Sequence, residues 1–199
     1  MTHEESFNLA VQLQHQGRFV EAERLYRQIL VVLPAAEIFN NLALVLEAQS
    51  RISEALSEFA KAVEARSDYV QGHFNLGNLL LKQKRFSAAE MALRRVLELD
   101  ADHVDALNAL GNLTLALRDP ASAVGFYRRA IALNPTFIDP RNNLGVALQQ
   151  LDRFAEAEHT FREVLVIKPG CLEVVHNLAG VCLAQKNFGN CLASNPSCI

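Results

Sequence analysis

The sequence lacks the features that indicate a membrane-spanning or nucleic-acid-binding protein. No apolar stretch approaches the roughly 18 residues that a membrane-spanning helix requires, and the apolar run at residues 29–33 is far shorter than that. Lysine and arginine number 19 against 22 aspartates and glutamates, which gives a net charge of −3. Because nucleic acids and anionic membranes are bound mainly through clustered positive charge, we expect neither as a partner.

Cysteine is missing from most of the chain. The four cysteines are Cys171, Cys182, Cys191 and Cys198, and none belongs to a CxxC pair. A disulfide framework would be spread through a small secreted protein. Residues 1–5 contain two glutamates and no basic region that leads into an apolar run, so we expect no secretory signal peptide. These observations predict a cytoplasmic protein with reduced thiols.

Residue patterns that would indicate a catalytic or metal centre are also missing. The six histidines are scattered, and none forms an HxxxH pair or lies at metal-ligand spacing from a cysteine. Neither GxxxxGK(S/T) nor GxGxxG occurs, so the sequence has no phosphate-binding loop of these types. We therefore expect no enzyme activity, no metal and no cofactor.

What the sequence does contain is one short phrase repeated six times. An Asn-Leu-Ala or Asn-Leu-Gly motif, with Ala in place of Asn once, ends on a small residue at positions 10, 43, 77, 111, 145 and 179. The last four intervals between these positions are equal, and the first is shorter by one. Self-similarity at such a period is typical of repeat proteins, in which stacked units build an extended surface.

Each unit is predicted to be a helix, a tight turn and a second helix. In the unit that begins at residue 104, apolar or small residues recur every three or four positions, as on one stripe of a helix. Asp119 can cap the second helix, and Pro120 suits its first position because the missing N–H would be unpaired there. Asn134 and Pro135 then end that helix.

A small residue and a large residue recur four positions apart in the second helix. The small residues are Ala22, Ala55, Ala89, Ala123 and Ala157, and the large ones are Tyr26, Phe59, Leu93, Tyr127 and Phe161. Glycine in a helix interior costs roughly 1 kcal/mol relative to alanine. Its presence at positions 77, 111 and 145 predicts that the two helices of a unit approach closely there.

This pattern resembles the tetratricopeptide repeat, with a small residue at position eight, Ala at twenty, an aromatic residue at twenty-four and Pro at thirty-two. The resemblance implies an all-α right-handed superhelix, an α-solenoid of antiparallel helix pairs with five full repeats and one incomplete repeat. The repeats span residues 3–35, 36–69, 70–103, 104–137, 138–171 and 172–188, within an array over residues 3–188. The tail, residues 189–199, has no helical stripe. The family's usual tryptophan at position four is missing throughout.

In arrays of this family the first helices line a concave groove, so the resemblance places a row of asparagines there. The candidate peptide-binding residues are Asn8, Asn41, Asn75, Asn78, Asn108, Asn112, Asn142, Asn143 and Asn177. A carboxamide can pair with both the N–H and the C=O of an extended peptide, whatever its sequence. The array is similar in this respect to the repeat region of O-linked N-acetylglucosamine transferases, which hold substrate polypeptide on an asparagine ladder. The alternative is that each asparagine hydrogen-bonds the neighbouring repeat.

Position two of the repeat is acidic in five units, at Glu4, Glu37, Asp105, Asp139 and Glu173. These carboxylates suit the first turn of a helix, where they stabilise the helix dipole by roughly 0.3–1 kcal/mol. The alternative is an acidic inner edge that favours basic peptides.

These observations predict a non-catalytic scaffold that binds a peptide or protein segment in its groove. The alternative is the substrate-recognition region of a larger enzyme, such as a glycosyltransferase whose catalytic domain is absent from this chain. Because the sixth repeat is never completed, Leu178, Val181 and Cys182 would lack a partner helix. The incomplete repeat indicates a truncated or frame-altered version of a longer protein, or an open end that docks onto another molecule. Assembly of copies into a homo-oligomer through this uncapped end is a further possibility.

Overall fold

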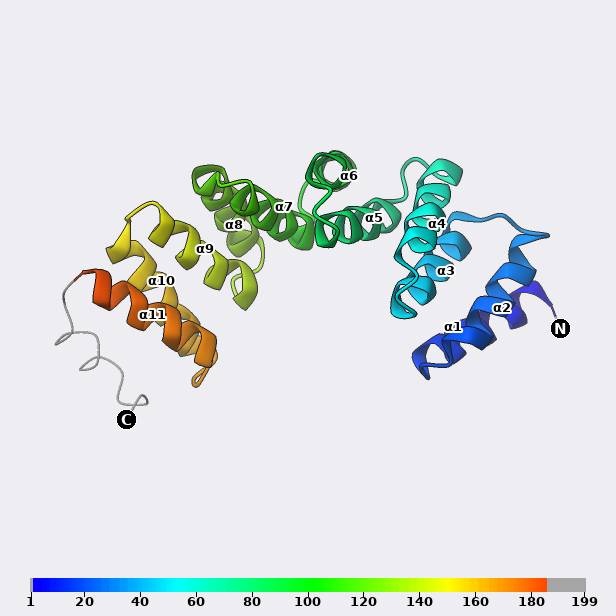
Figure 1. The fold of residues 1–199 in the computed structure, drawn as a ribbon, viewed down its shortest axis with the longest axis horizontal. Coiled ribbons are helices and arrows are strands. Elements are labelled where there is room, and N and C mark those ends of the chain that lie inside the picture. The colour runs from blue at the N-terminus through cyan, green and yellow to red at the C-terminus, as the bar shows by residue number, and fades with distance from the viewer. Residues whose placement is uncertain (1, 186–199) are drawn as a thin grey trace. The chain divides into compact units, whose positions relative to one another are not determined.

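The computed structural model describes residues 2–185 and contains only helices within that range (Figure 1). The chain divides into two compact units, Met1–Ala101 and Asp102–Ile199. The helices of the first unit are α1 (His3–His15), α2 (Phe19–Leu30), α3 (Ala36–Ala48), α4 (Ile52–Ala65), α5 (Val70–Lys82) and α6 (Phe86–Leu99). Those of the second are α7 (Val104–Ala116), α8 (Pro120–Leu133), α9 (Ile138–Gln150), α10 (Phe154–Ile167) and α11 (Leu172–Ala184). The prediction of an all-α repeat fold is confirmed.

Within each unit the first helices of the repeats lie on one side. In the first unit α3 contacts both α1 and α5, and in the second unit α9 contacts both α7 and α11. Each second helix packs on its own first helix and on the first helix of the next repeat within the unit, whereas no Cα atoms of α2 and α4, or of α8 and α10, lie within 8 Å of each other. The first helices of a unit are therefore closer together than the second helices, and we call the surface that they form the first-helix surface.

The turns inside the repeats use a left-handed residue to end the first helix. Gly17 has a φ of 75°, and the equivalent residues of the later repeats also have positive φ, although none of them is glycine: Ser50, Lys84, Arg118 and Asp152. In the second repeat the N–H of Ser50 donates to the carbonyl of Glu47 and the N–H of Arg51 donates to the carbonyl of Leu46. This Schellman-type arrangement satisfies carbonyls at the helix end and turns the chain into the next helix at once.

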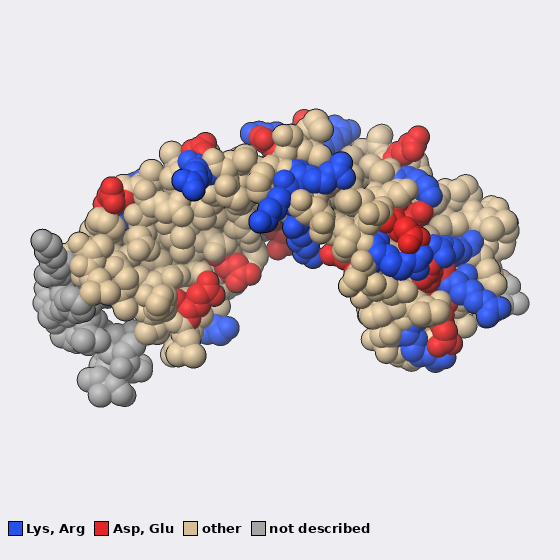
Figure 2. All heavy atoms as spheres, viewed as in Figure 1, with Lys and Arg blue, Asp and Glu red and all other residues tan. Residues whose placement is uncertain are grey.

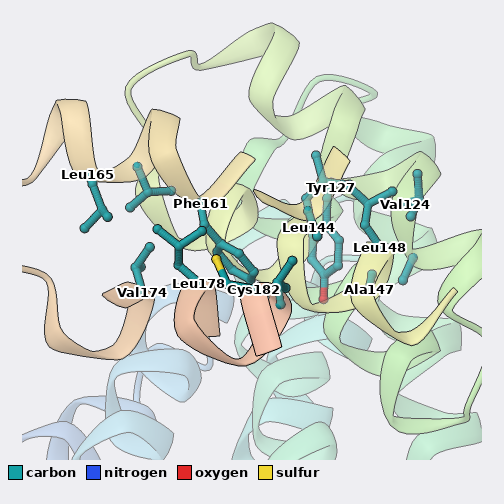
Figure 3. Close-up of a cluster of buried hydrophobic side chains, with 14 residues drawn as sticks. Val124, Tyr127, Leu144, Ala147, Leu148, Phe161, Leu165, Val174, Leu178 and Cys182 are labelled. Carbon is teal, nitrogen blue, oxygen red and sulfur yellow. The ribbon is translucent and has the colours of Figure 1, made fainter. Parts of the chain in front are cut away.

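The predicted pairing of small and large residues is confirmed in the core. A Cβ atom added at Gly111 would lie 2.4 Å from Cε1 of Tyr127, and one added at Gly145 would lie 2.5 Å from Cε1 of Phe161. Both rings are fully buried in the core cluster of the second unit, which Figure 3 shows. Burying such a side chain contributes roughly 1.5–3 kcal/mol, so these rings are major stabilising elements.

Ion pairs between helices add contacts that the sequence period alone does not indicate. Arg51 donates two hydrogen bonds to Glu54, of 2.7 and 2.5 Å, and Arg27 of the preceding repeat reaches Glu54 at 3.3 Å. Arg153 and Arg128 make the equivalent contacts with Glu156 in the second unit. A carboxylate at the start of a second helix is thus shared between two repeats.

Glu23 of α2 is the one buried glutamate in the part of the chain that the structure describes, and it forms ion pairs with arginines. Its carboxylate accepts hydrogen bonds from Nη1 of Arg51 at 2.7 Å and from Nε2 of Gln49 at 2.8 Å, and Arg27 lies 2.5 Å away. Burial alone would raise the pKa of Glu23, but these hydrogen bonds and charges lower it below its usual value.

The chain's end is described only as far as residue 185. The first helix of the sixth repeat is α11, whereas residues 186–188, the predicted tail 189–199, Cys191 and Cys198 lie outside the described residues. Cys171 is a free thiol, as predicted. Within residues 2–185, no helix has the length and apolar character needed to span a membrane.

Candidate peptide-binding surface

All nine predicted site residues lie on first helices, divided between the two units. The first unit carries Asn8 on α1, Asn41 on α3, and Asn75 and Asn78 on α5. The second unit carries Asn108 and Asn112 on α7, Asn142 and Asn143 on α9, and Asn177 on α11. Asn8 is exposed, Asn142 is buried, and the other seven are half-buried. Each unit therefore has its own group of carboxamides on its first-helix surface.

In the first unit the carboxamides form a chain that joins α5 to α3. Nδ2 of Asn75 donates to Oδ1 of Asn40 over 2.8 Å, and Nδ2 of Asn40 donates to Oδ1 of Asn41 over 3.3 Å. Gln71, one turn before Asn75, donates to Oδ1 of Asn75 over 2.9 Å. The side chain of Asn78 forms no hydrogen bond with another described residue, which leaves its groups available.

In the second unit hydrogen bonds between asparagines also link consecutive first helices. Nδ2 of Asn143 donates to Oδ1 of Asn112 over 2.9 Å, which joins α9 to α7. Nδ2 of Asn177 donates to Oδ1 of Asn142 over 3.2 Å, which joins α11 to α9. Oδ1 of Asn108 is buried and has no hydrogen-bond partner among the described residues.

These contacts are the ones expected from the alternative in which asparagine joins neighbouring repeats. At Asn75, Asn143 and Asn177 one N–H of the carboxamide donates to an asparagine of the preceding repeat. Each carboxamide has two N–H groups and two acceptor positions, so a single contact does not exhaust it. The inter-repeat hydrogen bonds also fix the orientation of the side chains, and this orientation is a prerequisite for presenting the remaining groups to a ligand.

Two tyrosines connect this surface with the core. The hydroxyl of Tyr127 donates to Oδ1 of Asn112 over 2.8 Å, and that of Tyr26 donates to Oε1 of Gln14 on α1 over 2.8 Å. Burial raises the pKa of Tyr26 to about 12 and also raises the pKa of Tyr127. Both hydroxyls therefore stay protonated and act as donors at neutral pH.

The acidic residues at position two are exposed in the first turns of their helices. This placement is expected both for carboxylates that stabilise the helix dipole and for an acidic inner edge that favours basic peptides. Nη1 of Arg66 pairs with Oε1 of Glu37 at 2.5 Å, and Asn142 donates to Oε1 of Glu173 over 2.9 Å. Figure 2 shows positive and negative side chains close together over much of the visible face of the first unit, whereas the second unit is mostly uncharged in this view. Among the described residues no group of His, Cys, Asp and Glu is arranged to hold a metal ion.

Comparison with known proteins identifies a relative by sequence. A stretch of 80 residues is 34% identical to "Protein O-mannosyl-transferase Tmtc3" of Drosophila melanogaster. The match covers 32% of this chain but only 9% of that protein, so the chain spans a small part of the relative's length.

Solved structures match over most of the chain. A tetratricopeptide repeat protein from Parabacteroides merdae has a TM-score of 0.82 at 17% identity, over 96% of this chain and 76% of that one. The pilF protein of Pseudomonas aeruginosa also has a TM-score of 0.82, at 18% identity, over 96% of this chain and 87% of that one. YrrB, described as a TPR protein with an unusual peptide-binding site, has a TM-score of 0.72 at 21% identity, over 84% and 87% of the two chains. Identities this low show a common fold.

Family models give the assignment. One tetratricopeptide repeat model matches residues 7–70 and 74–136, and a second matches residues 114–182. Together they cover the first helices that carry the asparagines as well as the second helices that carry the large core residues. The chain belongs to the tetratricopeptide repeat family.

Proposed function

We propose that this chain is a non-catalytic interaction module that binds an extended peptide segment on its first-helix surfaces. The observation that carries the proposal is the set of half-buried asparagines held in place by hydrogen bonds between consecutive first helices. Such side chains are already ordered before a ligand arrives, so less conformational entropy is lost on binding. The carboxamide groups left over suit a peptide backbone, which presents alternating donors and acceptors.

The comparisons support this proposal at the level of the family. Tetratricopeptide folds are generally interaction modules, and YrrB is described as having a peptide-binding site. The exposed carboxylates of position two favour a ligand with basic residues near the helix starts.

The test uses peptides selected from a random display library against the whole chain, with affinity then measured by fluorescence anisotropy. Asn75→Ala and Asn143→Ala each remove one inter-repeat amide, one in each unit. A lost hydrogen bond to the peptide is worth about 0.5–1.5 kcal/mol, so we expect roughly threefold to tenfold weaker binding by the variant of the unit that holds the peptide. Gln28→Ala, which removes an exposed carboxamide from the second helix α2, is the control and should bind normally. Failure to select any peptide, or unchanged affinity in both asparagine variants, would refute the proposal.

A second candidate is the substrate-recognition region of a larger glycosyltransferase. The observation that favours it is the 34% identity to the Drosophila O-mannosyl-transferase, within a protein much longer than this chain. Sequencing the transcript beyond the codon for residue 199 tests this candidate. A downstream frame that encodes a glycosyltransferase domain supports it, and a stop codon directly after Ile199 together with no such domain upstream refutes it.

A further inference from the structure

One buried acceptor on the first-helix surface of the second unit lacks a partner. Oδ1 of Asn108, at position five of the fourth repeat, is buried and accepts no hydrogen bond from another described residue. A buried polar atom without a partner costs free energy, so such atoms are uncommon in folded proteins. The equivalent oxygens of two other repeats show how this cost is avoided elsewhere in the chain.

Asparagines at the same repeat position in those two repeats do have a partner. Oδ1 of Asn40 accepts from Nδ2 of Asn75 over 2.8 Å, and Oδ1 of Asn142 accepts from Nδ2 of Asn177 over 3.2 Å. In both pairs the donor lies at position six of the next repeat, 35 residues further along the chain. The amide of a position-six asparagine is therefore within reach of a position-five oxygen in the preceding repeat.

Asn143 stands in the same relation to Asn108, but its amide has a different partner. Its Nδ2 donates over 2.9 Å to Oδ1 of Asn112, at position nine of the fourth repeat. In the second and fifth repeats, position nine is Leu44 or Val146, and neither side chain offers an acceptor. The fourth repeat therefore offers the incoming amide two acceptors, whereas the second and fifth repeats offer one.

The two acceptors are neighbours on one face of α7. Asn108 and Asn112 are four residues apart, which places their Cβ atoms about 5–6 Å from each other on a helix. A change of side-chain rotamer in Asn143 moves its amide over a distance of this order, with the helices in place. If the amide leaves Asn112, Oδ1 of Asn112 keeps its hydrogen bond from the hydroxyl of Tyr127 and gains one open acceptor position.

From these contacts we infer that peptide binding transfers the amide of Asn143 from Asn112 to Asn108. A backbone N–H of the peptide would take the open acceptor position on Oδ1 of Asn112, and Oδ1 of Asn108 would gain the partner that it lacks. A ligand shifts an equilibrium toward the state for which it has the higher affinity, so the peptide selects the arrangement with Asn143 on Asn108. The inference rests on the proposed function, since it describes how one part of the proposed surface responds to the bound peptide.

The first test follows the Asn143 amide by NMR in the whole chain labelled with ¹⁵N and ¹³C. The probe is acetyl-tetraalanine N-methylamide, which offers backbone groups and only methyl side chains. In the free protein the Nδ2 protons of Asn143 should show nuclear Overhauser effects to the β protons of Asn112. At saturation with the probe these effects should be replaced by effects to the β protons of Asn108.

The matched control ligand is the same peptide with every amide nitrogen methylated, so that it has no N–H to donate. It should leave the contacts of Asn143 unchanged. Contacts to Asn112 that persist at saturation with the probe, the lack of a saturable shift at Asn112, or the same response to the methylated peptide would each overturn the inference.

Two alanine substitutions in the free protein test whether Asn108 is unpaired before binding. Asn108→Ala removes an acceptor that has no partner, so the urea midpoint should stay the same or rise. Asn142→Ala removes the equivalent residue of the fifth repeat, which bonds both Asn177 and Glu173, and should lower the midpoint. If Asn108→Ala lowers the midpoint as much as Asn142→Ala does, Asn108 is already paired in solution and the inference is wrong.

Affinity for the probe tests the transfer itself. Asn108→Ala should weaken the probe roughly threefold to tenfold, because the displaced amide of Asn143 then finds no acceptor. In the Asn143→Ala background the same substitution should have no further effect, since no amide is left to transfer. Equal losses in both backgrounds would mean that Asn108 contacts the peptide directly, and this result, like unchanged affinity of the single variant, contradicts the inference.

These results are separable from the test of the proposed function. If library peptides bind and are weakened by Asn75→Ala or Asn143→Ala while the Asn143 amide stays on Asn112, the first-helix surface still binds peptides and the inference about the transfer is wrong. If the probe transfers the amide as described but no library peptide is selected, the inference is supported and the general proposal fails.

Discussion

The contact between Gly111 and Tyr127 allows a quantitative test of why glycine occurs in the first helices. In Gly111→Ala the new methyl group would meet three atoms of the Tyr127 ring at 2.4, 2.7 and 2.8 Å. The ring has little room to retreat, because it is fully buried and its hydroxyl is hydrogen-bonded to Asn112. The substitution therefore forces the two helices of the repeat apart or displaces the ring.

Two opposing effects set the expected magnitude. Overpacking a well-filled core costs typically about 1–3 kcal/mol, and the tight geometry places this site at the upper end. Alanine offsets about 1 kcal/mol of that through its better helix propensity. We therefore expect Gly111→Ala to lower the free energy of unfolding by about 2 kcal/mol.

The same unit provides a matched control for this prediction. Gly125 lies on the exposed side of α8, and a Cβ added there would meet nothing within 4 Å. Gly125→Ala should therefore raise the free energy of unfolding by about 1 kcal/mol through helix propensity alone. Urea denaturation followed by circular dichroism measures both variants. If Gly111→Ala is as stable as the parent protein or more stable, the close-approach argument is refuted.

A second substitution tests whether the ring of Tyr127 causes the loss of stability in Gly111→Ala. Gly77 faces Leu93 rather than a ring, and a Cβ added there would lie 2.8 Å from Cγ of Leu93, a less severe approach than the 2.4 Å to Cε1 of Tyr127 at Gly111. When Tyr127 is first changed to Leu, the further change Gly111→Ala should cost much less than it does in the parent. A double-mutant cycle gives the coupling energy between the two positions directly. Additive effects on the free energy of unfolding would show that the destabilisation does not come from contact between these two positions.

Three further predictions concern the turns, the buried ion pair and the tyrosine hydroxyl. Arg118 has a φ of 62°, so Arg118→Gly should raise the urea midpoint, with a gain of about 1 kcal/mol from relief of left-handed strain; an unchanged or lower midpoint would contradict it. The pKa of Glu23 is lowered in the folded state, so its stabilising contribution is present above about pH 4.3 and is lost as the pH falls through the folded pKa. Glu23→Gln should therefore flatten the acid limb of stability against pH, and an unchanged slope would contradict this. Tyr127→Phe removes the hydrogen bond to Asn112 and should cost about 1 kcal/mol in urea denaturation, with no change expected if that contact is not formed in solution.

The periodic part of the structure could be predicted from the sequence. The capping of α8 by Asp119, with Pro120 at its first position, follows from local rules, and the structure confirms both. The small residue at 111 and the large one at 127 are expected to pack because each recurs at the same place in all five full repeats. Such features depend on neighbours within one repeat, where the spacing along the chain fixes the distance in space.

Contacts between repeats are harder to predict, because they depend on side-chain rotamers as well as on helix positions. The sequence allows Asn143 to pair with either Asn108 or Asn112, and the structure shows that it pairs with Asn112. The ion pair between Arg51 and Glu23 joins two different repeats and has no counterpart in the repeat pattern.

The tyrosine hydroxyls that meet the first-helix surface have a practical consequence. The protein has no tryptophan and only three tyrosines. Tyr127 bonds Asn112, Tyr26 bonds Gln14 and packs edge-on against Phe7 at 6.1 Å, and Tyr69 stacks beneath Arg66. The fluorophore of Tyr127 therefore lies beside Asn112, one of the proposed peptide-binding residues. Unlabelled protein should report ligand capture through its own tyrosine emission, and single tyrosine-to-phenylalanine variants would assign the signal to a repeat.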